Sequence, residues 1–99
     1  METVVRHRDD GQATWFVNGL VTTKATVDET GRAYGLAEHL VSAASNPPVH
    51  IHADEDEAYY VLDGEMEFEV DGVCTVARPG SYALAPHGRP HTFLSLIHI

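Results

Sequence analysis

Short runs of alternating apolar and polar residues recur along this chain, and turn-forming residues separate them. No window of useful length carries apolar residues at positions i, i+3, i+4 and i+7, so the pattern indicates strands rather than helices. The clearest run covers residues 65–70, where Met66, Phe68 and Val70 share one face and three glutamates share the other. We expect strands over the following ranges: 14–17, 20–27, 33–41, 49–53, 58–62, 65–70, 73–77, 81–85 and from 91 onward.

Residues 33–41 admit two interpretations, because several residues in this segment also tolerate a helix. Gly35 lies inside the segment, and residues 28–31 approach it in the manner of a hairpin turn. Glycine weakens a helix and is typical of irregular strands, so a strand is the preferred interpretation.

Four dipeptides at the breaks between runs favour tight reversals of the chain. They are Asn18-Gly19, Asp63-Gly64, Asp71-Gly72 and Pro79-Gly80. These signals predict consecutive antiparallel hairpins, and many short strands with frequent turns indicate an all-β sandwich or barrel. Periodicity alone does not choose between the two architectures.

Length and charge narrow the class of protein. The 99 residues suffice for one domain with one core. With 6 Lys and Arg against 15 Asp and Glu, the net charge of −9 repels a phosphate backbone, so we expect no nucleic-acid partner. No apolar run approaches the ~20 residues that cross a bilayer. The first residues also lack the apolar stretch of a secretion signal, so we expect no membrane partner and a cytoplasmic location.

The chain has a single cysteine, Cys74, which cannot form an internal disulfide. It lies between Val73 and Thr75 in an apolar alternation, where a buried small hydrophobic residue is the ordinary interpretation. We therefore assign it no catalytic role.

Candidate chemistry is concentrated in histidines and one glutamate. On a strand, His50 and His52 project to the same face with their Cα atoms about 6–7 Å apart, which suits two adjacent corners of a metal site. A turn through residues 54–56 brings Glu57 back beside them, and its carboxylate adds an anionic oxygen ligand. His91 is a candidate for the remaining imidazole. The competing interpretations are polar strand histidines and, for residues 54–56, a solvated acidic turn.

The spacing of these residues resembles a known family. Two motifs match those of cupins: His50-x-His52-x4-Glu57-x6-Gly64 and Gly80-x5-Pro86-x-Gly88-x2-His91. Between about residues 13 and 93 the chain also resembles small bacterial quercetinase-like cupins outside the motifs. The resemblance implies a cupin jelly-roll barrel in which His50, His52, Glu57 and His91 hold one divalent metal.

The chain departs from the family pattern at two positions. Ala44 stands where a glycine usually precedes the histidine pair, and Ser95 stands where an asparagine often follows the last histidine. Tyr59 shares a face with Glu57 by parity, yet we expect it to pack in the barrel like the other aromatic residues. His87 is interpreted as structural or incidental, as are His7 and His39.

The resemblance also suggests boundaries along the chain. We expect an N-terminal extension over residues 1–12 and a cupin β-barrel domain over residues 13–93. The last residues, 94–99, match a translation of the transposase adapter end used in sequencing libraries, so we expect a non-native tail there. The barrel is then expected to be incomplete at its C-terminus, and the alternative is a genuine short strand.

The function expected from the resemblance is that of a metal-dependent dioxygenase acting on a small organic substrate, with Glu57 as the catalytic proton acceptor. Two alternatives stay open: a non-catalytic module that binds a small ligand or a metal, and a cupin isomerase or decarboxylase. Imidazole with carboxylate accepts iron, manganese, nickel, copper or zinc, of which iron or manganese is favoured. The resemblance also implies a homodimer.

Overall fold

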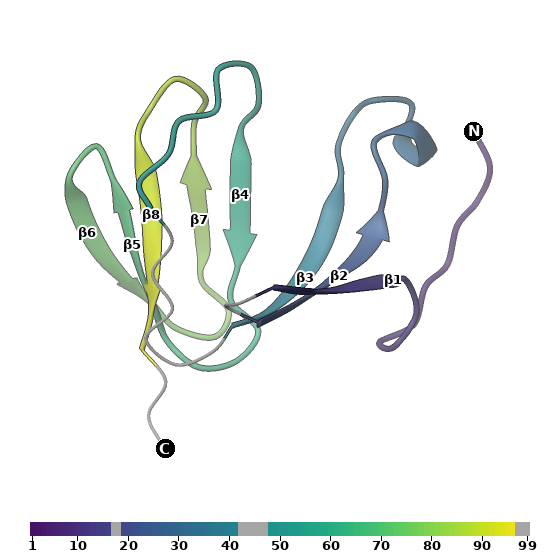
Figure 1. The fold of residues 1–99 in the computed structure, drawn as a ribbon, viewed down its shortest axis with the longest axis horizontal. Helices are drawn as coiled ribbons and strands as arrows, with labels where there is room; N and C mark the ends of the chain where they lie inside the picture. The colour runs from purple at the N-terminus through teal and green to yellow at the C-terminus, as the bar shows by residue number, and fades with distance from the viewer. Residues whose placement is uncertain (17–18, 42–47, 97–99) are drawn as a thin grey trace. The chain divides into compact units, whose positions relative to one another are not determined.

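In the computed structural model the chain is all-β, and the structure describes residues 1–16, 19–41 and 48–96 (Figure 1). All strand pairs in the described part are antiparallel. The strands are β1 (Gln12–Phe16), β2 (Gly19–Ala25), β3 (Leu36–Val41), β4 (Glu57–Tyr60), β5 (Met66–Val70), β6 (Val73–Ala77), β7 (Tyr82–Ala85) and β8 (His91–Ser95). The chain divides into two compact units, Met1–Val41 and Ser42–Ile99.

The first unit is a three-stranded sheet in the order β1-β2-β3. The register shifts between Thr23 and Ala25, and a single turn of 3-10 helix, η1 (Asp28–Thr30), follows β2. Gly31 ends that turn with a φ of 63°, a conformation that favours glycine. The strand expected over 33–41 is confirmed from Leu36, and it starts later than expected because η1 and the loop after it occupy the intervening residues.

The second unit holds two sheets, β4-β7 and β6-β5-β8, which share one core. Val61, Phe68 and Ala77 form this core, and partly buried apolar side chains from both sheets pack against them. The alternation over residues 65–70 therefore correctly identifies the core face of β5, because Phe68 is buried on it. Glu67 and Glu69 fall on the opposite face.

The turn prediction is correct at Asp71-Gly72. Val70 pairs with Val73, and both residues of the intervening turn have positive φ, 53° and 79°, as in a type I′ hairpin. The strands on either side of Asn18-Gly19, β1 and β2, also pair as a hairpin, but Asn18 itself lies outside the described residues. Asp63-Gly64 and Pro79-Gly80, by contrast, carry the chain from one sheet of the second unit to the other. The expected series of consecutive hairpins is wrong there, because β4 pairs with β7 and β5 pairs with β8.

Two further expectations differ from the structure. Residues 49–53 form no strand, and their pairing is a single antiparallel bridge between His50 and His91. Pro48 precedes this segment and has no N–H to extend a ladder. Cys74, which the alternation placed in the core, is exposed. The alternation does not reveal that β6 lies at the edge of its sheet, next to β5 only.

The end of the described chain belongs to the sheet of β8. Leu94 and Ser95 pair with Glu67 and Met66, and the N–H of Leu96 donates to the carbonyl oxygen of Glu65. Ala44 and His98 lie outside the described residues. The domain boundaries expected from the sequence stay predictions. The described part of the chain holds no helix with the length and apolar character that a membrane span needs.

Candidate metal centre

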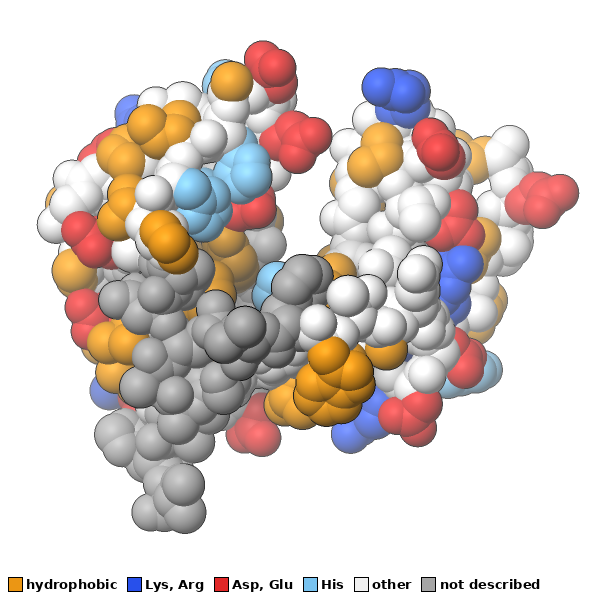
Figure 2. All heavy atoms as spheres, in the orientation of Figure 1, with side chains coloured by type: hydrophobic (Ala, Val, Ile, Leu, Met, Phe, Trp, Pro, Cys, Tyr) orange, Lys and Arg blue, Asp and Glu red, His pale blue; other side chains and the backbone are white. Residues whose placement is uncertain are grey.

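Four side chains from three separate segments meet in the second unit. His50 and His52 come from the segment before β4, Glu57 is the first residue of β4, and His91 is the first residue of β8. Each offers a ligand atom, and these four atoms lie within 4.8 Å of one another. In Figure 2, histidine side chains are visible beside acidic side chains in this unit. The residues that the sequence predicts as a group are therefore close in space.

The three imidazoles surround a common point. The ring centroid of His50 lies 4.2 Å from that of His91 and 5.0 Å from that of His52, and the rings of His52 and His91 are 5.5 Å apart. His91 is almost fully buried, at 3% exposure, whereas the other three side chains are about one-third exposed. The centre is therefore closed on the side of β8 and accessible from the side of the two neighbouring histidines.

Backbone hydrogen bonds hold the histidine segment against β8. The N–H of His50 donates to the carbonyl oxygen of His91 at 3.0 Å, and the N–H of His91 donates to the carbonyl oxygen of His50 at 2.9 Å. The N–H of Gly88 donates to the carbonyl oxygen of His52 at 2.6 Å. These bonds bring residues 36 or more positions apart in sequence to one place without an extended strand.

Strand register directs Glu57 and His91 toward the interior. His91 pairs with Val70 and shares its face with Phe93, which pairs with the buried Phe68. On the other sheet Glu57 pairs with Ala85, which is 2% exposed. The small side chain of the alanine leaves room beside it for a carboxylate. Both polar residues thus lie at the end of an otherwise apolar interior.

Backbone carbonyl groups orient two of the imidazoles. The Nδ1 atom of His50 lies 3.0 Å from the carbonyl oxygen of Pro48, and that of His91 lies 3.3 Å from the carbonyl oxygen of Arg89. A carbonyl oxygen only accepts, so each Nδ1 carries the hydrogen in these contacts. In the neutral ring the lone pair is then on Nε2, the atom directed at the centre, as is usual for a metal-binding histidine.

Two side chains contact the carboxylate of Glu57. Its Oε2 accepts a hydrogen bond from the Tyr59 hydroxyl at 2.5 Å and lies 2.8 Å from Nε2 of His91. Burial raises the pKa of the Glu57 carboxyl, but these hydrogen bonds and the charges of His52 and His91 together bring that pKa below its ordinary value. The pKa of Tyr59 is raised, first by burial and then by its bond to Glu57. At neutral pH, Glu57 is therefore a carboxylate and Tyr59 a hydroxyl donor.

One atom of the centre has no hydrogen-bond partner in the described part of the chain. Nε2 of His52 is buried, and although Glu57 Oε1 lies 3.1 Å away, the contact lacks hydrogen-bond geometry. Leaving a buried polar atom unpaired costs about 1–3 kcal/mol. A cation placed among the four ligand atoms gives this nitrogen a partner, so the donor set fits a transition metal. The role of the four side chains as metal ligands stays a prediction.

Sequence reasoning undervalued three neighbours of the centre. Tyr59 packs against Phe68 as expected, with ring centroids 5.0 Å apart, but it also donates to Glu57. Asp56, interpreted as part of a solvated turn, and His87, interpreted as incidental, are hydrogen-bonded to each other. Tyr59 is two residues from Glu57 on the same strand, so the sequence already placed the two side chains on one face. Nothing in the spacing relates Asp56 to His87.

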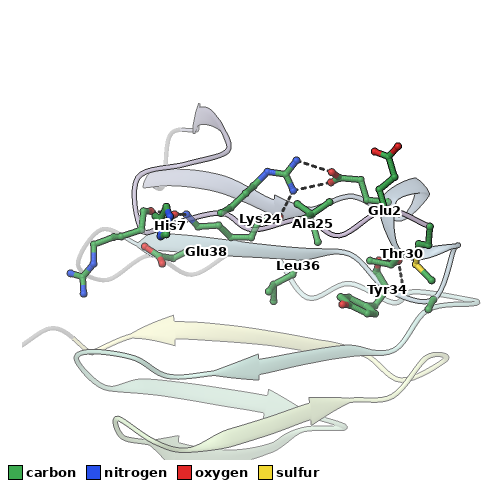
Figure 3. Close-up of a pocket in the computed structure, with 14 residues that line it drawn as sticks. Glu2, His7, Lys24, Ala25, Thr30, Tyr34, Leu36 and Glu38 are labelled. Carbon is green, nitrogen blue, oxygen red and sulfur yellow. Dashed lines mark hydrogen bonds and ion pairs between the residues drawn. The ribbon is translucent and has the colours of Figure 1, made fainter.

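A separate groove lies in the first unit and has a volume of about 720 Å³ (Figure 3). Two of its cations, Arg6 and Lys24, are already engaged within the protein. Arg6 forms an ion pair with Glu29 at 2.7 Å, and the amino group of Lys24 donates to three backbone carbonyl oxygens, those of His7, Arg8 and Asp10. The hydrogen bond from Arg6 is the largest of the effects that lower the pKa of Glu29 to about 2. These interactions fasten the N-terminal segment to the sheet.

Comparison with known proteins places this geometry in a family. The family model described as Cupin domain matches residues 38–96, more than half of the chain. Quercetin 2,3-dioxygenase of Bacillus subtilis (strain 168) is 35% identical over 78 residues, which cover 75% of this chain and 23% of that protein. The chain therefore spans about a quarter of the length of this curated relative.

Two solved structures share the fold at low sequence identity. An RmlC-like cupin from Shewanella frigidimarina NCIMB 400 is 17% identical with a TM-score of 0.74, over 95% of this chain and 81% of that one. KdgF from Halomonas sp. is 18% identical with a TM-score of 0.57, over 87% of this chain and 66% of that one. The all-β jelly-roll fold expected from the sequence is thereby confirmed.

Proposed function

This chain belongs to the cupin domain family, and from that premise we propose that it is a metal-dependent dioxygenase acting on a small organic molecule. The observation that carries the proposal is the meeting of three imidazoles and one carboxylate around the unpaired, buried Nε2 of His52. The reaction class is supported by the identity with quercetin 2,3-dioxygenase. Because the chain covers a small share of that relative, the substrate is proposed only as a class.

The four proposed ligands are His50, His52, Glu57 and His91. Imidazole nitrogen with one carboxylate oxygen accepts iron, manganese, nickel, copper or zinc, and we propose iron or manganese. When bound, such a metal supplies Lewis-acid polarisation of a substrate oxygen. The chain itself supplies the orientation of the rings, through the carbonyl groups that accept from Nδ1 of His50 and His91.

Glu57 is the proposed acid–base group. Its lowered pKa keeps it ionised at neutral pH, so it accepts a proton from a substrate hydroxyl placed beside it. The Tyr59 hydroxyl donates to Oε2 and limits the rotation of the carboxylate. Behind Tyr59, the rings of Phe68 and Phe93 form an apolar wall, with centroids 5.0 and 6.1 Å from that of Tyr59. This wall excludes water from the core side of the site.

Two other functions use the same centre. A binding module would hold a small ligand or the metal without turnover, and an isomerase or decarboxylase would use the metal and Glu57 without consuming oxygen. The identity with a dioxygenase favours oxygen chemistry over both. Oxygen consumption separates the three proposals.

The test begins with the purified metal-free chain, titrated separately with Fe(II), Mn(II), Ni(II), Cu(II) and Zn(II). We expect one tightly bound metal per chain and oxygen uptake with at least one of three substrate classes, catechols, flavonols and diketones. The matched pair of variants is His91→Ala, which removes a proposed ligand, and His39→Ala, which removes an exposed histidine of β3. Failure of the unsubstituted chain to bind any metal would refute the proposal, and binding without oxygen uptake would leave one of the other two functions.

A further inference from the structure

One loop leads into β4 and another into β8, the strands that begin with the proposed ligands Glu57 and His91, and Asp56 and His87 join the two loops. We propose that Asp56 is a positioning residue, whose carboxylate tethers His87 and thereby holds Glu57 and His91 at the separation that the metal requires. The inference rests on the metal centre of the proposed function. It assigns a role to two residues that contribute no ligand themselves.

The tether consists of two hydrogen bonds to a single oxygen. Oδ1 of Asp56 accepts from the backbone N–H of His87 at 2.9 Å and from its ring Nδ1 at 2.7 Å. A carboxylate oxygen only accepts, so the ring nitrogen is the donor in this contact. Because one bond fixes the backbone and the other fixes the side chain, the tether restricts both the position of the loop and the orientation of the ring.

The tether is the third of three connections between the same two segments. The first is the reciprocal pair of backbone bonds between His50 and His91, and the second joins Gly88 to His52. The third joins His87 to Asp56, the residue immediately before Glu57. The first two connections hold the histidine segment, but the chain then turns through residues 53–55 before β4 begins. The third connection is placed to set where Glu57 enters its strand.

The ion pair between Asp56 and His87 is expected to contribute little to the free energy of unfolding. The side chains of Asp56 and His87 are 57% and 59% exposed, and exposed ion pairs contribute about 0–1 kcal/mol. Outer groups that orient metal ligands, in contrast, typically change metal affinity by about 10–100-fold when they are removed. The tether is therefore expected to affect the metal site far more than the unfolding of the domain.

Three variants separate the effect of the hydrogen bonds between Asp56 and His87 from the effect of the negative charge of Asp56. Asp56→Ala removes both, Asp56→Asn removes the charge but keeps an oxygen that accepts from His87, and Glu55→Ala removes an exposed charge next to the tether. Metal affinity is measured by competition with a chelator, and the absorption spectrum of bound Co(II) reports ligand geometry. We expect Asp56→Ala to weaken binding about 10–100-fold with an altered spectrum. For Asp56→Asn and Glu55→Ala we expect a metal affinity within about threefold of that of the unsubstituted chain and an unchanged Co(II) spectrum.

Two results would overturn the proposal in this arm. Equal affinities for Asp56→Ala and Glu55→Ala would mean that only charge near the site matters. An affinity for Asp56→Asn as low as that for Asp56→Ala would mean that the accepting oxygen is not what positions the loop. If Asp56→Ala fails to fold, His87→Ala takes its place. That variant keeps the backbone bond and is expected to lose less affinity, and no loss at all would reject the tether.

A second arm needs no metal. Amide hydrogen exchange of the metal-free chain measures the protection of the N–H groups of Gly88 and His91, which bond to His52 and His50. We expect Asp56→Ala, or His87→Ala in its place, to speed their exchange, and Glu55→Ala to leave it unchanged. Unchanged exchange in the first variant would contradict the tether. If the chain binds no metal, the proposed function fails, and the exchange arm alone decides whether the tether holds the loops.

Discussion

Substitution of Tyr59 by phenylalanine isolates one interaction of the centre. The variant keeps the aromatic ring, which packs against Phe68, and removes only the hydroxyl that donates to Glu57 Oε2. Because this hydrogen bond stabilises the ionised carboxylate, its loss raises the pKa of Glu57. The other contact of the same oxygen is with Nε2 of His91.

The size of the change follows from the exposure of the carboxylate. A hydrogen bond to a charged group contributes about 1.5–3 kcal/mol, and Glu57 is 35% exposed, which places it at the lower end of that range. Since about 1.4 kcal/mol corresponds to one pKa unit, we expect the pKa of Glu57 to rise by about one unit. The change is read from the carbon-13 chemical shift of the side-chain carboxyl during a pH titration of the metal-free chain.

A matched control lies one residue further along β4. Tyr60→Phe also removes a hydroxyl, but Tyr60 is on the opposite face and is 63% exposed. We expect this substitution to leave the titration of Glu57 unchanged. A pKa of Glu57 that stays constant or falls in Tyr59→Phe would refute the reasoning, because the hydroxyl would then not stabilise the charge.

Three further predictions concern the framework around the site. Phe68→Ala should lower the free energy of unfolding by about 3–5 kcal/mol in denaturant titrations, while Val73→Ala, at an exposed position, should cost far less; equal losses would contradict the core assignment. Gly72→Val should cost about 1–2 kcal/mol in the same assay, because its φ of 79° strains a side chain, and no loss would contradict the type I′ turn. Arg6→Met should lower the thermal midpoint above pH 4.5, where unfolded Glu29 is ionised, and the difference should shrink as the pH falls to about 2, where only the hydrogen bond of Arg6 to the carbonyl oxygen of Lys24 is left; a difference that does not shrink would reject the ion pair as its main source.

The sequence predicted most of the local structure because local rules decide it. The alternation around Phe68 and the positive-φ turn at Asp71-Gly72 depend only on neighbouring residues, and both are correct. The pairing of β4 with β7 and of β5 with β8 depends on contacts between distant residues, which periodicity does not contain. For the same reason the segment around His50 was expected to be a strand, although its pairing with His91 is a single bridge.

The proposed ligands were predictable for a different reason. The spacing around His50, His52, Glu57 and His91 matches family motifs, and a motif records residues that meet in space although they are distant in sequence. The supporting groups are not in the motifs. Whether the Tyr59 hydroxyl reaches Glu57 depends on side-chain rotamers, and whether Asp56 reaches His87, 31 residues away, depends on how two loops approach each other. Their interactions become visible only with atomic positions.

The central claim, that three imidazoles and one carboxylate bind a single metal, is tested most directly by X-ray absorption spectroscopy of the chain loaded with one equivalent of zinc. We predict a first shell of nitrogen and oxygen at about 2.0–2.2 Å, with outer-shell scattering from three imidazole rings that falls to two in His91→Ala. Loss of the zinc on dialysis, or scattering from fewer than three rings in the unsubstituted chain, would contradict the account.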